Sequence, residues 1–340
     1  MDAEHIIKNY SPLLQVRNLK TYFFTVDGIA RAVDDVSINL YEGKTLGLVG
    51  ESGCGKSVTA MSIMRLIKDP PGKTVEGRIL FNGQDLLQIS TKEIKAVRGK
   101  QIAMIFQEPM TSLNPVYKIG DQIAEMLMLH KNLNKRESWD CTVEMLKKVQ
   151  IPSPEKRVHD YPHQLSGGMR QRVMIAMALS CNPKILIADE PTTALDVTVQ
   201  AQIIDLMLEL KEEFGTAILL ITHDLGVIAE IAERVDVMYA GKVVEEAQTL
   251  SIFEEPKHPY TQGMLKSLPK LDTDFESSGR RLQEIKGMVP SFYELPVGCS
   301  FHPRCRYAME VCREKPPDLI DIGGDHLVQC HLYAPNKKGI

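Results

Sequence analysis

The chain has 340 residues, a length that predicts one large domain with an appendage, or two domains. Apolar residues make up 44% and charged residues 25% of the chain, which is ordinary for a soluble globular protein. The net charge is −4, whereas a nucleic-acid binder would usually be strongly basic. No stretch approaches the ~18 consecutive apolar residues of a membrane span, and the N-terminus has no apolar signal core. We therefore expect a cytoplasmic chain that reaches a membrane only through partners.

The first predicted elements are strands within residues 13–49. The runs LLQVRNL, AVDDVSINL and KTLGLVG are short and apolar, and Asp-Gly and Glu-Gly turn signals separate them. A glycine-rich loop follows the third run, and the pattern VTAMSIMRLI after it predicts a helix. Strand, glycine loop and helix in this order are the expected setting of a phosphate-binding loop.

The phosphate loop, residues 50–57, matches the pattern G-x-x-x-x-G-K-S in full. Its glycines allow backbone N–H groups to turn inward around a β-phosphate, and the following helix points its positive end at the anion. Lys56 is expected to bridge the β- and γ-phosphates, and Ser57 to bind Mg²⁺. Cys54 occupies a free position where only its backbone is used, and Val58 can offer its backbone N–H to the α-phosphate. The predicted ATP-binding residues of this region are Gly50, Ser52, Gly53, Cys54, Gly55, Lys56, Ser57 and Val58.

Residues 120–165 have a different pattern. DQIAEMLMLH and CTVEMLKKVQ show helical periodicity with charged faces, and two proline-containing segments follow them. We interpret this stretch as a helical insertion.

A buried parallel strand is predicted at residues 184–190, KILIADE, because the run is almost continuously apolar. At its end, beside the phosphate loop, Asp189 would hold Mg²⁺ and Glu190 would polarise the attacking water. Adjacent side chains on a strand point opposite ways, so the two carboxylates need not share a role. The pattern TVQAQIIDLMLELKEEFG then predicts an amphipathic helix that ends at Gly215, and AILLITHD predicts another buried strand.

The segment Leu165-Ser-Gly-Gly-Met-Arg-Gln-Arg172 precedes the acidic strand. Its serine and two glycines would open a helix, and their N–H groups with the serine hydroxyl would form a second anion site. This segment resembles the signature motif of the ABC ATPase family, with Met169 where glutamine is the most common residue. The resemblance implies that the site closes on the γ-phosphate held by another subunit. The implied signature residues are Leu165, Ser166, Gly167, Gly168 and Met169.

Four further segments resemble motifs of the same family, in the expected order. Gln107 matches the Q-loop, whose amide is implied to reach Mg²⁺ or the nucleophilic water. His223 matches the switch histidine, which is implied to hydrogen-bond the γ-phosphate and orient Glu190. Phe23 matches the aromatic residue that stacks on adenine, with Tyr22 as the alternative after a one-residue shift. The D-loop, which crosses the dimer interface, corresponds to Ala194, Leu195 and Asp196.

Four cysteines crowd the loop-rich end of the chain: Cys299, Cys305, Cys312 and Cys330. Two short gaps and a long one can bring four thiolates to one point, which suits an iron–sulfur cluster or Zn²⁺, although the C-x2-C knuckles usual in structural zinc sites are absent. Free thiols or disulfides stay open. The cysteine-rich end and the stretch KHPYTQ, residues 257–262, are similar to the C-terminal extension of ATPases from oligopeptide and dipeptide uptake transporters. That resemblance implies a [4Fe–4S] cluster of structural role on these four cysteines.

The resemblance implies an α/β fold in which a RecA-like P-loop NTPase core carries an N-terminal antiparallel β region, a helical subdomain and a metal-binding C-terminal extension. The expected bounds are residues 13–119 and 166–250 for the ATPase core, 120–165 for the helical subdomain and 251–340 for the extension.

The implied function is that of an energy-coupling subunit that binds ATP and Mg²⁺ at the cytoplasmic face of a membrane. Its implied partners are a related ATPase of the "F" type, bound head to tail to this "D" type chain, two membrane subunits, and indirectly an extracytoplasmic substrate-binding protein. An ATPase subunit does not touch the cargo, so nickel, glutathione or sugar–peptide transport are alternatives to peptides. A soluble ABC protein of translation or DNA repair is disfavoured by the single cassette and the acidic net charge.

Overall fold

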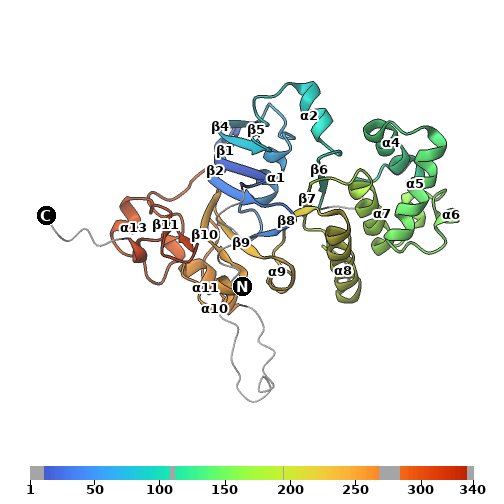
Figure 1. Ribbon diagram of the computed structural model, residues 1–340. Helices are drawn as coiled ribbons and strands as arrows, with labels where there is room; N and C mark the ends of the chain where they lie inside the picture. The colour runs from blue at the N-terminus through green and yellow to red at the C-terminus, as the bar shows by residue number, and fades with distance from the viewer. Residues whose placement is uncertain (1–10, 108–111, 194, 268–283, 335–340) are drawn as a thin grey trace, which may run out of the picture.

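The computed structural model describes residues 11–107, 112–193, 195–267 and 284–334. The centre of this part is an eight-stranded sheet in the order β11-β12-β10-β9-β3-β8-β7-β6 (Figure 1). Strands β6, β7, β8, β3 and β9 pair in parallel, whereas β10, β11 and β12 join in antiparallel pairs. The bounds are β3 Thr45–Val49, β6 Ile102–Ile105, β7 Ile185–Asp189, β8 Ala217–Ile221, β9 Arg234–Tyr239, β10 Lys242–Gln248, β11 Ile320–Asp321 and β12 Leu327–Val328.

A second, antiparallel sheet has the order β2-β1-β4-β5, with β1 Leu14–Thr25, β2 Gly28–Leu40, β4 Gly72–Phe81 and β5 Gln84–Asp85. The three runs predicted as strands are confirmed as β1, β2 and β3. Helix α1 (Lys56–Ile63) lies between the two sheets, because Ala60 and Ile63 share one buried apolar cluster with Leu14 of β1 and Leu48 of β3. The helix is shorter than its pattern predicts, since the chain turns at Arg65, where φ is 51°.

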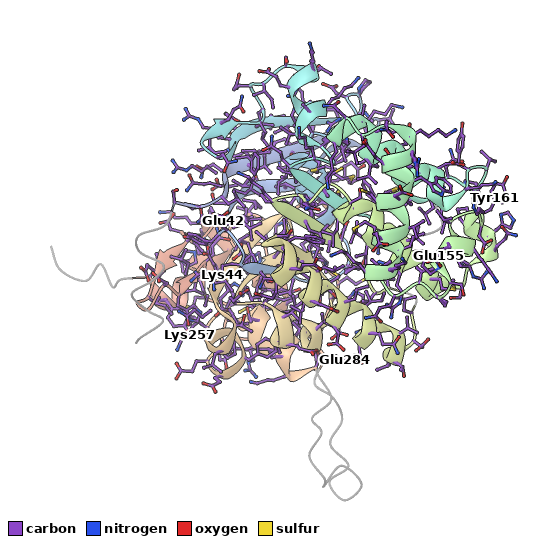
Figure 2. All side chains as sticks on the ribbon, turned by 45° about the vertical axis from the view of Figure 1, so that its right-hand side comes forward. Glu42, Lys44, Glu155, Tyr161, Lys257 and Glu284 are labelled. Atoms are coloured by element: carbon purple, nitrogen blue, oxygen red, sulfur yellow. The ribbon has the colours of Figure 1, made fainter. Side chains whose placement is uncertain are left out.

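The segment predicted as a helical insertion contains α4 (Ile119–Lys131), α5 (Lys135–Lys148) and α6 (Pro154–Arg157). A capping box opens α5: Asn134 Oδ1 accepts from the N–H of Glu137, whose carboxylate accepts from the N–H of Asn134. Helices α4 and α5 both contact α7 (Gly167–Leu179), and Ile123, Leu146 and Val173 belong to one buried apolar cluster. This helical lobe and the C-terminal extension lie at opposite ends of the molecule (Figure 1), and Figure 2 shows Glu155 and Tyr161 on the outer edge of the lobe.

Six further α-helices are found in the described residues. They are α2 (Thr91–Val97), α8 (Val197–Phe214), α9 (Leu225–Ile231), α10 (Thr249–Glu254), α11 (Pro259–Lys266) and α13 (Val311–Glu314). The predicted amphipathic helix is confirmed as α8, which ends at Gly215 in the left-handed conformation, φ 64°, that favours glycine. Among the described residues, every helix is too short or too polar to cross a membrane.

The C-terminal extension does more than form loops. Its strand β12 pairs with β10 of the core, with Glu245 opposite Val328 and Glu246 opposite Leu327, and β11 pairs with β12. These strands were not predictable from the sequence, because segments of two residues carry no periodic signal. The extension therefore enlarges the sheet of the core.

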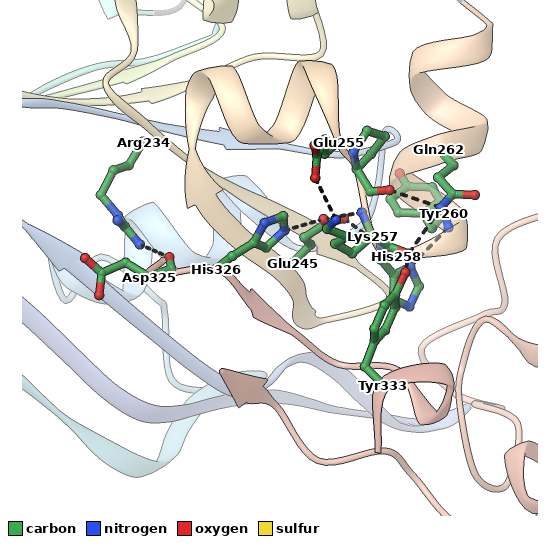
Figure 3. A network of polar contacts seen from close by, with 11 residues as sticks. Arg234, Glu245, Glu255, Lys257, His258, Tyr260, Gln262, Asp325, His326 and Tyr333 are labelled. Carbon is green, nitrogen blue, oxygen red and sulfur yellow. Dashed lines mark hydrogen bonds and ion pairs between the residues drawn. The ribbon is translucent and has the colours of Figure 1, made fainter. Parts of the chain in front are cut away.

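Glu245 of β10 joins the extension to the core (Figure 3). Its fully buried carboxylate accepts from the N–H groups of Lys257 and His258, at 2.6 and 2.9 Å, and lies 2.7 Å from Nε2 of His326. Burial alone would raise the pKa of Glu245, but its hydrogen bonds, that of His326 foremost, lower it below the usual value. Nδ1 of His258 in turn accepts from the N–H of Tyr260 at 3.1 Å and caps α11. The KHPYTQ stretch thus forms a buried polar joint.

Acid is expected to weaken this joint through His258. Burial lowers the pKa of His258 from 6.5 to about 4, so in mild acid the unfolded chain takes up a proton that the folded chain does not. The contribution of neutral, buried His258 to the free energy of unfolding is complete above about pH 6.5 and is lost as the pH falls towards about 4. We expect His258→Asn, which replaces the capping nitrogen with a capping oxygen, to abolish about 2 to 3 kcal/mol of the stability loss between about pH 7 and about pH 4.5.

Urea denaturation followed by circular dichroism across this pH range measures the effect. His163→Asn, at an exposed histidine of the helical lobe, is the matched control and should leave the pH dependence unchanged. If the stability of the His258 variant fell with pH as steeply as that of the wild type, His258 would not be the group that weakens the protein in acid.

Candidate functional site

The phosphate loop connects the end of β3 to the start of α1, as predicted. Two of its glycines are required by space: a Cβ on Gly50 would lie 2.2 Å from the carbonyl oxygen of Met238, and one on Gly55 would lie 2.2 Å from that of Ala32. Both also have positive φ, 155° and 108°. Lys56 is 5% exposed, and its Nζ donates to the carbonyl of Gly50 at 2.7 Å. The loop is therefore packed closely against the sheet with its lysine directed inward.

A pair of oxygens suited to Mg²⁺ lies at the first turn of α1. Oγ of Ser57 donates to Oδ1 of Asp189, the last residue of β7, at 3.1 Å. Burial raises the pKa of Asp189, and neighbouring Glu190 raises it further, although the bond from Ser57 works against this. Because Mg²⁺ prefers hard oxygen ligands and would favour the ionised carboxylate, the two residues fit the ion that the sequence analysis assigned to them.

Glu190 lies at the centre of the polar contacts beyond β7. It follows the strand with φ 48°, a left-handed conformation that is costly for a non-glycine residue and is common at functional sites. Oε2 accepts from Nε2 of Gln107 at 2.9 Å and from the hydroxyl of Thr193 at 2.9 Å. Oε1 lies 3.2 Å from Nδ1 of His223. The turn aims the carboxylate at three residues from three different segments.

These contacts decide the charge of Glu190. Burial alone would raise its pKa, but the hydrogen bonds from Thr193 and His223 lower it below its usual value, so the group is ionised at neutral pH. The amide of Gln107 donates to Glu190 in this structure, whereas the family resemblance implies that it reaches Mg²⁺ or the nucleophilic water. Thr193 was missed in the sequence analysis; its only signal was a hydroxyl three residues after the glutamate.

The expected adenine site is a cavity of about 570 Å³, a size usual for small-molecule sites. Phe23 lines it together with Ser52, Gly53 and Val58. Tyr22, the alternative, is absent from this lining, and its hydroxyl donates to Oδ1 of Asp34 at 2.7 Å. The geometry therefore favours Phe23.

The same cavity has a second wall that the sequence analysis missed. Residues Val289–Tyr293 of the extension line it together with residues of the N-terminal sheet. The carbonyl of Phe292 accepts from the N–H of Arg31 in β2 at 3.1 Å, and the hydroxyl of Thr25 donates to that of Tyr293 at 3.2 Å. No local pattern could have indicated this wall, because it joins segments more than 250 residues apart in the chain.

The signature residues form the start of α7. Ser166 is its N-cap, and its Oγ accepts from the N–H of Met169 at 3.3 Å, while Leu165 is buried beneath. Gly167 and Gly168 lie close to the D-loop and α8, since a Cβ on Gly167 would be 3.7 Å from Leu195 and one on Gly168 would be 2.8 Å from Val199. Asp196 caps α8 by accepting from the N–H of Val199 at 2.9 Å. Ala194 lies outside the described residues.

The four cysteines of the extension lie within electrostatic reach of one another. Burial, with the neighbouring thiols, raises the pKa of Cys330 to about 11, and the N–H of Cys299 donates to the carbonyl of Cys312 at 2.8 Å. All are free thiols. Over the ranges that the structure describes, however, no three His, Cys, Asp or Glu side chains are placed to hold a metal ion. The prediction of a metal-binding extension is therefore not supported by the geometry. The spacing of the cysteines allows the four thiols to meet at one point but does not require them to do so.

A phosphate loop with its lysine, an oxygen pair for Mg²⁺, and an ionised glutamate held by a glutamine and a histidine define an ATPase of the ABC class. The family described as ABC transporter matches residues 33–193, and that described as oligopeptide/dipeptide transporter, C-terminal region, matches residues 244–312. Among solved structures, a dimeric bacterial ABC transporter cassette aligns with a TM-score of 0.62 at 29% identity, covering 69% of this chain and 98% of that one. The cassette cbiO1 of Clostridium perfringens aligns with a TM-score of 0.61 at 27% identity, covering 72% and 92%.

Curated relatives match nearly the whole chain. A probable peptide ABC transporter ATP-binding protein of Sinorhizobium fredii is 52% identical over 94% of both chains. The oligopeptide transport ATP-binding protein AppD of Bacillus subtilis is 52% identical over 95% of this chain and 97% of its own. The dipeptide transport ATP-binding protein DppD of Haemophilus influenzae is 51% identical over 96% and 97%. The chain belongs to the ABC transporter family, among the ATP-binding proteins that carry the oligopeptide/dipeptide transporter C-terminal region.

Proposed function

We propose that this ATPase drives the uptake of dipeptides or oligopeptides through a membrane transporter. The observation that carries the hydrolytic part is Glu190, ionised and held by Gln107 and His223 at the carboxyl end of β7. The peptide cargo is supported by the names of relatives that are about half identical over nearly the whole chain.

In this proposal the residues of one chain bind and orient ATP. Backbone N–H groups of residues 50–57 and Nζ of Lys56 hold the phosphates, Phe23 stacks on the base, and Ser57 with Asp189 would hold Mg²⁺, which neutralises phosphate charge when bound. Glu190 takes the proton of the attacking water or orients it, and His223 hydrogen-bonds the γ-phosphate. Gln107 keeps Glu190 in place until the water arrives.

The second half of each site is proposed to come from another subunit. Ser166 is exposed at the N-terminus of α7, where the N–H groups of Gly167 and Gly168 would receive a γ-phosphate in trans. Two ATPase chains would then bind two ATP molecules head to tail, with the D-loops, including Leu195 and Asp196, at the interface. Closure and hydrolysis would move two membrane subunits between inward- and outward-facing states, with cargo delivered by an extracytoplasmic binding protein.

The partner ATPase is proposed to be a related chain of the "F" type, as the resemblance implies. Cross-linking of the chain in its native membrane, followed by mass spectrometry, distinguishes a heterodimer from a pair of identical chains. The peripheral position at the cytoplasmic face is part of the same proposal.

Transport assays test the cargo. In vesicles that hold the complete transporter, ATP should drive uptake of a labelled dipeptide or oligopeptide, and an excess of unlabelled peptide should compete with it. ATP-driven uptake of nickel or glutathione with no peptide uptake would replace the cargo but keep the ATPase.

The metal content of the extension is a separate proposal. We propose, from the resemblance, that the four cysteine thiolates bind a [4Fe–4S] cluster, with Zn²⁺ as the alternative; the proposal is supported by four free thiols near one another in the C-terminal extension. Anaerobic purification with iron and zinc analysis and an absorbance scan near about 400 nm decides between them. Protein free of both metals that still hydrolyses ATP would end this proposal.

A further inference from the structure

The C-terminal extension contacts the phosphate loop at Glu51. The guanidinium of Arg304 donates to both carboxylate oxygens of Glu51: Nη1 to Oε2 at 2.6 Å and Nη2 to Oε1 at 3.0 Å. The side chain of Arg304 is 6% exposed and that of Glu51 is 30% exposed. A two-pronged, largely buried arginine–carboxylate pair is among the stronger polar contacts in proteins and fixes orientation as well as distance.

A second contact from the extension holds the backbone of the same residue. The N–H of Glu51 donates to the hydroxyl of Tyr260 at 2.8 Å. Tyr260 is fully buried in α11, and its ring packs against Tyr239 and Phe301 with centroids 4.7 and 5.5 Å away. Its hydroxyl therefore has little freedom, and the backbone of the phosphate loop is fixed at this point.

Arg304 is itself fixed by contacts that do not involve the loop. Nε donates to the carbonyl of Lys286 at 3.2 Å, Nη2 donates to that of Ile285 at 3.3 Å, and the guanidinium lies over the ring of Tyr239, 5.8 Å from its centroid. A side chain held in this way positions its partner with little additional loss of conformational freedom.

Holding Glu51 affects the residues that bind phosphate. The carbonyl of Glu51 accepts from Nζ of Lys56 at 3.1 Å, and its N–H belongs to the backbone turn between Gly50 and Gly55. A loop that already has its binding conformation does not have to be ordered when the ligand arrives, which improves affinity without changing the chemical step. The extension also forms one wall of the base cavity through Val289–Tyr293, so it borders the proposed ATP site at both ends.

We propose that Arg304 and Tyr260 are positioning residues for the phosphate loop, through which the C-terminal extension sets the affinity of this chain for ATP. This inference rests on the proposed binding of ATP at residues 50–57. It gives the extension a part in nucleotide binding in addition to its docking on the core.

Arg304→Met in the full-length chain tests the proposal, with Arg306→Met, at an exposed neighbouring arginine, as the control. We expect the Kd and the KM for MgATP to rise about tenfold in Arg304→Met, with kcat changed less than about twofold, because the loop must then be ordered by the ligand. Arg304→Lys, which keeps one charged donor, should recover part of the affinity. Glu51→Gln should resemble Arg304→Met, and the double variant should be little worse than either.

Hydrogen exchange of the nucleotide-free protein gives a readout independent of hydrolysis. The amides of residues 50–57 should exchange faster in Arg304→Met than in the wild type and in Arg306→Met, while those of β7 and β8 are unchanged. Unaltered loop exchange and unaltered Kd in a folded Arg304→Met protein would overturn the proposal and leave a docking contact. A wild-type protein that binds no ATP would instead refute the proposed function, and faster loop exchange in the variant would still show the positioning.

Discussion

The variant Glu190→Gln is expected to bind MgATP as tightly as the wild type and to hydrolyse it about a hundred- to a thousandfold more slowly. The substitution keeps the size of the side chain, and an amide oxygen can still accept from Thr193. It removes the negative charge that the surrounding hydrogen bonds stabilise, so the attacking water is no longer polarised. Phosphate release under saturating ATP measures kcat, and equilibrium titration with a fluorescent nucleotide measures Kd.

Glu212→Gln is the matched control, because this carboxylate lies on α8 and is 81% exposed. It should change neither kcat nor Kd. Since hydrolysis opens the proposed head-to-tail dimer, ATP should also cause Glu190→Gln to sediment as a dimer for longer than the wild type. Turnover equal to that of the wild type would show that another group activates the water.

The second large effect is expected at the lysine of the phosphate loop. Lys56→Met keeps the length and the buried stem of the side chain but removes the ammonium group, whose present acceptors are backbone carbonyls of the loop. The phosphates of ATP would then lose the positive charge of Lys56 as a binding partner. We expect the Kd for MgATP to rise at least about a hundredfold, which is about 2.7 kcal/mol.

Calorimetric titration with MgATP measures this loss. Lys44→Met, at a side chain that is 57% exposed and lies just before β3, should bind as the wild type does. Binding by Lys56→Met within a few-fold of the wild type would place the nucleotide elsewhere on the molecule.

Contiguous motifs were the most predictable part of the site. The phosphate loop lies between β3 and α1 because a short buried strand, a glycine turn and a helix are each determined by neighbouring residues. The same holds for α8, whose end at Gly215 was predicted from the sequence. The role of Glu190 was predicted from its place at the end of an apolar strand, and that of His223 from the family resemblance; in the structure their side chains lie 3.2 Å apart.

Contacts between distant segments were not predictable. The wall at Val289–Tyr293 and the contact of Arg304 with Glu51 join the two ends of the chain, and neither leaves a periodic or local pattern. The short strand β12 was missed for the same reason. For the cysteines, in contrast, the sequence predicted more than the structure supports. Cys299 and Cys330 are near each other, but the described residues do not form a geometry that could hold a metal ion.

Phosphate release from MgATP by the purified wild-type chain, alone and within its membrane complex, tests the central claim most directly. We expect turnover that saturates with ATP, requires Mg²⁺, and disappears in both Glu190→Gln and Lys56→Met. Turnover that persists in both variants, or a wild-type complex that binds MgATP without ever releasing phosphate, would contradict the account of this chain as an ATP-hydrolysing subunit.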